Sequence, residues 1–133
     1  PSNIAAAKLL NYDGTLTAVP VAGSTLTIAA ESAGTLTRLF VERTAGAAAN
    51  NVTVEVLSIN PGSPPGAVYL NSIYTVNRIT AWNPANPLDN ALNPPLDWVN
   101  DDSPQSQYLY VAIVPNVAGD SFRARLYTRR GEV

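Results

Sequence analysis

The chain has 133 residues, of which 46% are hydrophobic and 14% charged, and its formal net charge is −2. This length suits a single domain, and the charge gives no global attraction to nucleic acid. The sequence contains no cysteine and no histidine, which excludes disulfides, thiolate nucleophiles, histidine-dependent catalytic triads and His-ligated zinc. The composition therefore favours a binding or structural protein over an enzyme, and it implies no cofactor. No apolar run is long enough to predict a membrane span.

The first ten residues are predicted to form an N-terminal arm that precedes one domain over residues 11–133. Small residues predominate from Ser2 to Ala7. Asn3 to Leu10 could form a helix, but it is too short to be stable alone. The arm lacks the basic region and long apolar core of a signal peptide, so we expect synthesis in a cytoplasm without export by the general route.

β-Branched residues and turn signals predict strands through the next part of the chain. Two Thr-rich runs at 15–21 and 24–29, separated by Ala22-Gly23, predict a hairpin. Further strands are predicted at 35–43, 51–59, 67–70 and 73–82, with a Pro- and Gly-rich break at 60–66.

The segment 83–104 interrupts this pattern and predicts a long Pro- and Asn-rich loop. It holds five of the eleven prolines, which is unusual for any regular element. Leu88, Leu92 and Trp98 are too apolar to be left in water. We therefore expect them to contact a partner, with capping of a monomer's own core as the alternative.

Two strong strands are predicted at 107–114 and 121–129. The first is apolar on both faces, as expected of a central strand. In the second, one face carries Phe122, Ala124 and Leu126, and the other carries Arg123, Arg125, Tyr127 and Arg129. About eight short strands separated by turns predict an all-β fold, an antiparallel β-sandwich of jelly-roll type.

Three acidic residues close together, Asp97, Asp101 and Asp102, offer the oxygen ligands that Ca²⁺ prefers. Their spacing matches no ordered calcium loop, and Asp and Asn beside proline are ordinary turn formers. We therefore predict turns here and no metal site.

The aromatic residues allow two interpretations. They could form a platform for sugars, but filling the core of a sandwich is the favoured role for such large side chains. The residues concerned are Trp82, Trp98, Tyr69, Tyr74, Tyr108 and Tyr110.

Arginine dominates the basic residues and gathers near the C-terminus. Arg123, Arg125 and Arg129 are predicted to share one face of a strand. The planar guanidinium suits partly desolvated protein interfaces, which we favour over a phosphate contact in an acidic chain. A solvated strand face is the alternative.

A short Cys-free chain rich in Ala, Thr and Asn, with a small-residue arm from Ser2 to Ala7, resembles in general character the decoration or cement proteins of tailed-phage heads. The resemblance implies a virion protein that binds capsid subunits at symmetry axes, often as a homotrimer, and stabilises the shell. The alternative is a carbohydrate-binding β-sandwich module of a fibre or surface protein. The residues expected to bind the partner are Ile4, Leu9, Leu10, Leu88, Leu92, Trp98, Arg123, Arg125 and Arg129.

Overall fold

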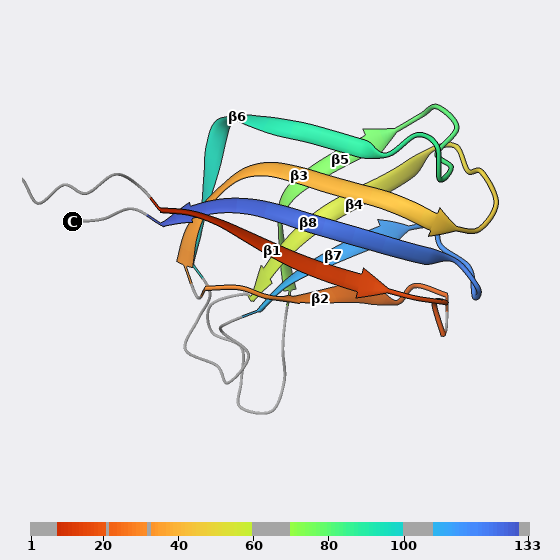
Figure 1. Ribbon diagram of the computed structural model, residues 1–133, viewed down its shortest axis with the longest axis horizontal. Helices are drawn as coiled ribbons and strands as arrows, with labels where there is room; N and C mark the ends of the chain where they lie inside the picture. The colour runs from red at the N-terminus through yellow and green to blue at the C-terminus, as the bar shows by residue number, and fades with distance from the viewer. Residues whose placement is uncertain (1–7, 21, 32, 60–69, 100–107, 131–133) are drawn as a thin grey trace, which may run out of the picture.

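The computed structural model describes residues 8–20, 22–31, 33–59, 70–99 and 108–130. These ranges form eight antiparallel strands in two four-stranded sheets, packed face to face as a β-sandwich (Figure 1). The strands are β1 (Lys8–Leu16), β2 (Thr25–Ala29), β3 (Ala33–Ala45), β4 (Val52–Ile59), β5 (Leu70–Arg78), β6 (Leu88–Val99), β7 (Tyr108–Val114) and β8 (Ser121–Arg130). Within the same ranges, no helix is long and apolar enough to cross a membrane.

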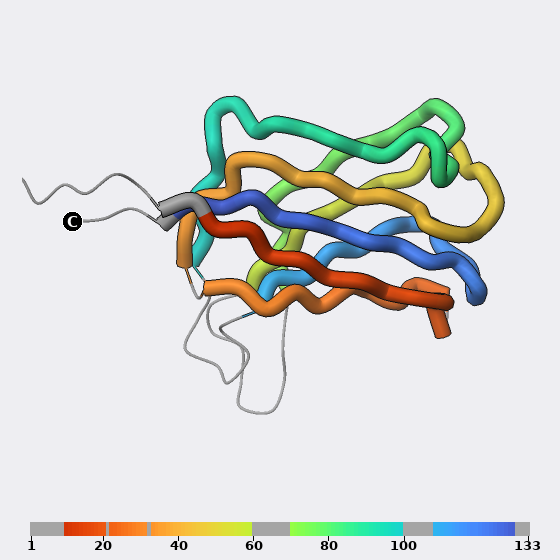
Figure 2. The backbone as a smooth tube through the Cα atoms, in the orientation of Figure 1, coloured from red at the N-terminus to blue at the C-terminus, as the bar shows by residue number. Residues whose placement is uncertain are grey.

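The strand order is that of a jelly roll. Sheet A has the order β1-β8-β3-β6, and sheet B has the order β2-β7-β4-β5. The pairs β1–β8, β2–β7, β3–β6 and β4–β5 are those of one long antiparallel ribbon. Pairing of β3 with β8 and of β4 with β7 wraps this ribbon into two sheets (Figure 2). The predicted all-β sandwich is therefore confirmed.

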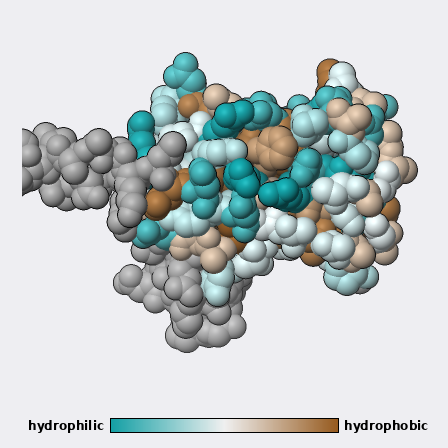
Figure 3. Space-filling model, viewed as in Figure 1, coloured by the Kyte–Doolittle hydropathy of each residue, from teal (hydrophilic) through white to brown (hydrophobic). Residues whose placement is uncertain are grey.

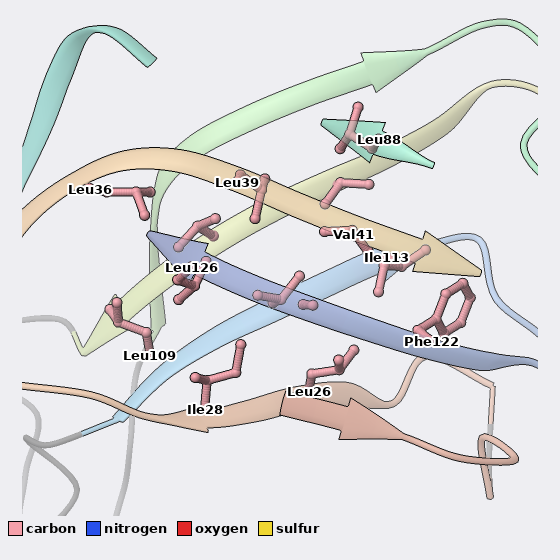
Figure 4. Close-up of a cluster of buried hydrophobic side chains, with 14 of the residues drawn as sticks. Leu26, Ile28, Leu36, Leu39, Val41, Leu88, Leu109, Ile113, Phe122 and Leu126 are labelled. Carbon is pink, nitrogen blue, oxygen red and sulfur yellow. The ribbon is translucent and has the colours of Figure 1, made fainter. Parts of the chain in front are cut away.

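Alternating burial explains why these segments form strands. In β4, Val52, Val54 and Val56 are fully buried while the residues between them are partly exposed. Side chains from both sheets meet between them, as Figure 4 shows for Leu26 and Ile28 of β2 and the buried residues of β3 and β8. Each large apolar side chain removed from water contributes roughly 1.5–3 kcal/mol, so this layer holds the two sheets together.

The predicted loop at 83–104 is wrong at its centre, because Leu88–Val99 forms β6. This strand is the edge of sheet A, and its pairing with β3 skips from Ala91 to Leu96. Pro94 and Pro95 fall in the skipped stretch, where a missing N–H removes no hydrogen bond from the ladder. Prolines therefore mark an interrupted edge strand here, and not a loop.

The predicted hairpin of 15–21 with 24–29 is also wrong. β1 ends at Leu16 and pairs with β8, whereas β2 pairs with β7 in the other sheet. Ala18 has a positive φ of 54°, and the buried Val19 donates its backbone N–H to the carbonyl of Asp120 at 2.6 Å. This long-range contact, which local turn signals do not contain, directs the chain from one sheet to the other.

The weak helix signal from Asn3 to Leu10 gives no helix at its last three residues, because β1 begins at Lys8. Leu9 pairs with Arg129 and Leu10 pairs with Thr128, so the expected boundary after residue 10 falls inside a strand. The β-pairing that β8 offers outweighs a weak local helix signal. Ile4 and the remainder of the predicted arm lie outside the described residues.

The two strands predicted at 67–70 and 73–82 are replaced by β5, which runs without a break from Leu70 to Arg78. Residues 67–69 lie outside the described residues. Trp82 forms an isolated bridge with Ala49 instead of continuing the strand. The strands predicted at 35–43, 51–59, 107–114 and 121–129 are confirmed to within two residues.

Candidate functional site

The four loops between β1 and β2, β3 and β4, β5 and β6, and β7 and β8 gather at one end of the sandwich (Figure 1). We call this surface the loop end and define it by residues 17–20, 22–24, 46–51, 79–87 and 115–120. The jelly-roll order brings these loops together, because alternate connections of an antiparallel ribbon lie at the same end. Asp120 is the one charged residue in the sequence of these segments.

Hydrogen bonds join the loops of the loop end in pairs. Ala49 and Trp82 exchange backbone hydrogen bonds of 2.8 and 3.3 Å, which join the β3–β4 loop to the β5–β6 loop. Asn116 accepts the backbone N–H of Gly23 at 2.6 Å and donates to the carbonyl of Ser24 at 3.2 Å. These bonds fix the β1–β2 loop to the β7–β8 loop, so the surface is organised before any partner binds.

A buried ion pair beneath the loop end links the pair of loops β3–β4 and β5–β6 to the pair β1–β2 and β7–β8. Arg43 at the end of β3 and Asp120 lie 2.9 Å apart between Nη1 and Oδ1, with 2% and 4% of their side chains exposed. The guanidinium of Arg43 lies 5.0 Å from the ring centre of Phe122 and 5.5 Å from that of Trp82. These two rings stack at 5.6 Å. The charge pair is therefore enclosed by aromatic side chains and stabilised by both cation–π contacts.

Above this pair lies an open hollow of about 210 Å³. Small and apolar residues form most of its wall: Ala47, Ala48, Ala49, Pro115 and Val117, with Arg43, Asn116 and Asp120 at the base. Ile79 and Val117 are 74% and 61% exposed nearby in the loops, and Val114 is 54% exposed where β7 ends. Apart from Arg78, which donates to the carbonyl of Pro87 at 3.0 Å at its edge, this surface can be covered by another protein without removing a charge from water.

The outer side of sheet A is the second candidate surface. We call it the arginine face and define it by Arg38, Arg123, Arg125 and Arg129 with Asp13, Glu42 and Asp89. The expected alternation of β8 is confirmed, because Arg123 and Arg129 are exposed while Phe122, Ala124 and Leu126 are buried. Figure 3 shows this face as mainly hydrophilic, with a small hydrophobic area among the hydrophilic side chains.

Most arginines of this face are paired with carboxylates of the same chain. Arg38 donates from Nε and Nη2 to the two oxygens of Asp89 at 2.7 and 2.6 Å. Arg125 donates to the two oxygens of Asp13 at 2.5 and 3.2 Å. Arg123 lies 3.9 Å from Glu42. Exposed pairs of this kind add little stability, but they fix the direction of each guanidinium.

The pairing shifts the pKa values of Arg38, Asp89 and Arg125. The hydrogen bond from Arg38 lowers the pKa of Asp89, and the same bond raises the pKa of Arg38. The hydrogen bond to Asp13 likewise raises the pKa of Arg125. A hollow of about 350 Å³ lies among these side chains, with Phe40 and Tyr127 in its wall. Three of the four positive charges are thus balanced within the face, which leaves little to attract phosphate.

Comparison with known proteins gives no relative from which a role could be transferred. No family model matches this chain, and neither does any curated protein or solved structure. The chemistry of its surfaces therefore has to be read from the residues themselves.

The residues that the sequence predicts to bind a partner lie in three different regions: the arginine face, strand β1 and the core. Arg123, Arg125 and Arg129 share the arginine face. Leu10 is half-buried in β1, and Leu9 lies in the same strand. Leu88, Leu92 and Trp98 are buried in the core between the sheets. Their apolar surface is covered within the chain, so we do not carry them into a contact surface.

The acidic and aromatic residues that the sequence singled out as candidates lie at other positions. Asp97 accepts a hydrogen bond of 2.6 Å from the hydroxyl of Thr35, and Asp101 and Asp102 lie outside the described residues. In the described part of the chain, no group of three or more His, Cys, Asp and Glu residues could hold a metal. Trp82 and Trp98 are buried core residues, whereas Tyr108 and Tyr110 are half-buried on the outer side of sheet B.

The loop end was not found from the sequence, although a signal for it was present. Each of its four loops lacks an exposed charge in its sequence, and Ile79 and Val117 are exposed apolar residues within these loops. Only the strand order shows that these segments share one surface. The arrangement holds no histidine, thiol or carboxylate pair placed for catalysis among the described residues, and it is suited to binding.

Proposed function

We propose that this protein is a non-enzymatic structural component of a larger protein assembly, a decoration or cement protein of a virion shell. The observation that carries the proposal is the loop end. Four loops present an organised surface whose own segments contain one charged residue, Asp120, which is buried and paired with Arg43. The neighbouring Arg78 donates to the carbonyl of Pro87 at the edge of this surface. Interfaces between proteins are depleted in charge at their centre in the same way.

Two properties of the loop end support a protein partner over a small ligand. Ile79 and Val117 project from different loops, so their apolar surface favours a broad contact over a closed pocket. The cross-loop hydrogen bonds hold both loops in place beforehand, which reduces the entropy lost on binding. A rigid module of this kind can stabilise a shell by joining neighbouring subunits.

The arginine face has a supporting role in this proposal. Its guanidinium groups are already directed by Asp13 and Asp89, and such pairs at the rim of an interface set orientation more than affinity. We therefore assign the main contact to the loop end and treat Arg123, Arg125 and Arg129 as rim residues.

The proposal is tested on particles made from the genome that encodes this chain. Particles are purified on a density gradient, and their proteins are quantified by mass spectrometry. The chain should sediment with the particles at a constant ratio to the main shell subunit. Recovery of the chain in the soluble fraction or in the cell envelope, with none in the particles, would contradict the proposal.

A second candidate is carbohydrate binding, favoured by a specific pair of aromatic residues. Tyr108 and Tyr110 are half-buried on the outer side of sheet B, where stacked sugar rings could lie against them. Quenching of tyrosine fluorescence by soluble oligosaccharides tests this candidate. Loss of the quenching in Tyr110→Ala would support it, and no change across neutral and acidic oligosaccharides would exclude it.

A further inference from the structure

The four strands at the sheet edges are protected to different degrees. An edge strand exposes unpaired backbone N–H and C=O groups, and proteins normally block such edges with prolines, charges or neighbouring elements. β1 and β2, the edges on one side of the sandwich, pack against each other. Gly14 permits their close approach, since a Cβ there would lie 2.6 Å from Cγ1 of Ile28. On the other side, β6 contains Pro94 and Pro95.

β5 has none of these protections along most of its length. Among the described residues it pairs with β4 alone. It runs for nine residues without proline, and no residue from Leu70 to Asn77 is charged. A register shift opposite Val56 and Leu57 interrupts its first half, but the segment from Tyr74 to Arg78 pairs regularly. Within the part of the chain that the structure describes, this segment is therefore open to pairing with another strand.

The side chains of this edge are also incompletely covered. Tyr74 and Val76 pack against the core but are only partly buried, and Leu70 is 38% exposed. A strand added beside β5 would cover the half-buried pair and hydrogen-bond the free backbone groups at the same time.

We propose that β5 is the interface of a two-fold homodimer, in which the β5 strands of two copies pair in antiparallel orientation. In the register centred on Val76, Val76 faces its own copy and Thr75 faces Asn77. Tyr74 then faces Arg78, a favourable aromatic and cationic combination. In this register no two residues of like charge face each other across the interface. A single two-fold rotation pairs the β5 edges of both copies. These properties favour a second copy over a foreign strand.

The resulting sheet is continuous across the two-fold axis, with β5 of each copy at its centre. β5 ends at Arg78, next to the loop end. The inference nevertheless does not depend on the proposed function, because the residues that pair, Tyr74 to Arg78, are not part of the loop end. It also differs from the trimer that the resemblance to decoration proteins implies, since an isologous contact closes at two copies.

Charge substitutions on the exposed side of β5 test the dimer and its register together. In Thr75→Lys/Asn77→Lys, each new lysine faces another lysine of the second copy. In Thr75→Lys/Asn77→Glu, each lysine faces a glutamate. Both original residues are exposed, so the fold should be kept. The matched control is Thr25→Lys/Thr27→Lys, which places two lysines at the same spacing on exposed positions of β2.

Sedimentation equilibrium over about 1–500 μM measures the association of each variant. The wild type and the β2 control should dimerise alike, the Lys/Lys variant about tenfold more weakly, and the Lys/Glu variant at least as tightly as the wild type. Any of three sedimentation results would overturn the inference: a monomeric wild type throughout the series, a Lys/Lys variant that dimerises normally, or a Lys/Glu variant as weak as Lys/Lys. Hydrogen exchange gives a further test. If the β5 amides become protected only when a different protein is added, the edge binds a foreign strand and the homodimer inference is overturned.

Discussion

Arg43 and Asp120 form a buried ion pair that joins the end of β3 to the β7–β8 loop, with Nη1 and Oδ1 2.9 Å apart. Asp120 Oδ2 also accepts the backbone N–H of Val117 at 2.9 Å, so one carboxylate fixes both the arginine and its own loop. In the described part of the chain, Arg43 Nε is buried without a hydrogen-bond partner. The buried guanidinium therefore depends on Asp120 for its compensating charge.

Asp120→Asn should lower the free energy of unfolding by about 3–5 kcal/mol, because it leaves the charge of Arg43 buried without a counter-ion. Arg43→Met/Asp120→Asn should recover part of this loss, since the uncompensated charge is removed. Urea unfolding of both single variants and the double variant measures the coupling. Additive effects of the two substitutions would mean that the pair is not energetically linked.

Gly46→Ala should disturb the ion pair between Arg43 and Asp120 by a steric collision. Gly46 has a φ of +123°, and a Cβ there would collide with Oδ1 of Asp120 and lie 2.8 Å from Nη1 of Arg43. Gly23 is the matched control, because its φ is +87° but a Cβ added there would have no atom within 4 Å. Thermal unfolding should show Gly46→Ala to be less stable than Gly23→Ala by about 1–3 kcal/mol. Equal losses would show that backbone strain alone is responsible.

Asp89→Asn should change how the free energy of unfolding depends on pH. Because Arg38 lowers the pKa of Asp89 below its ordinary value of 3.8, this pair stabilises the fold above about pH 4. The contribution is lost as the pH falls through the lower pKa of the folded state. Asp89→Asn should therefore be slightly less stable than the wild type at pH 7, and the difference in the free energy of unfolding should shrink as the pH falls below about 4. A difference that stays constant from pH 7 into this acidic range in chemical unfolding would point to a cause other than the charge pair.

The strands that the sequence predicted well each have one face buried. Val52, Val54 and Val56 alternate with partly exposed residues, and Arg123 and Arg125 alternate with buried ones, so both patterns are local. β6 was missed because its prolines occupy an interrupted edge, where local rules predict a loop. The partners of β1 and β2 were missed because Lys8 pairs with Arg130 at the other end of the chain.

The candidate site shows the same division between local and long-range information. The part of the arginine face on β8, with Arg123, Arg125 and Arg129, follows from the period of one strand and was predicted. Arg38 and the carboxylate partners come from other strands and were not predicted. The loop end requires four separated segments to meet, which only the strand order brings about. The role of Arg43 could not be foreseen either, because its partner Asp120 lies far away in the sequence and both are buried together.

The loop end can be tested directly by introducing a charge into it. Ile79→Asp adds a carboxylate at a 74% exposed position of the loop end, and Val99→Asp adds the same group at a 69% exposed position of the opposite end. Both proteins should fold, since neither residue is part of the core. We expect particles purified on a density gradient to retain Val99→Asp at the wild-type ratio and to lose Ile79→Asp at least tenfold, because a buried carboxylate without a partner opposes binding. Equal retention of the two variants would contradict docking through the loop end.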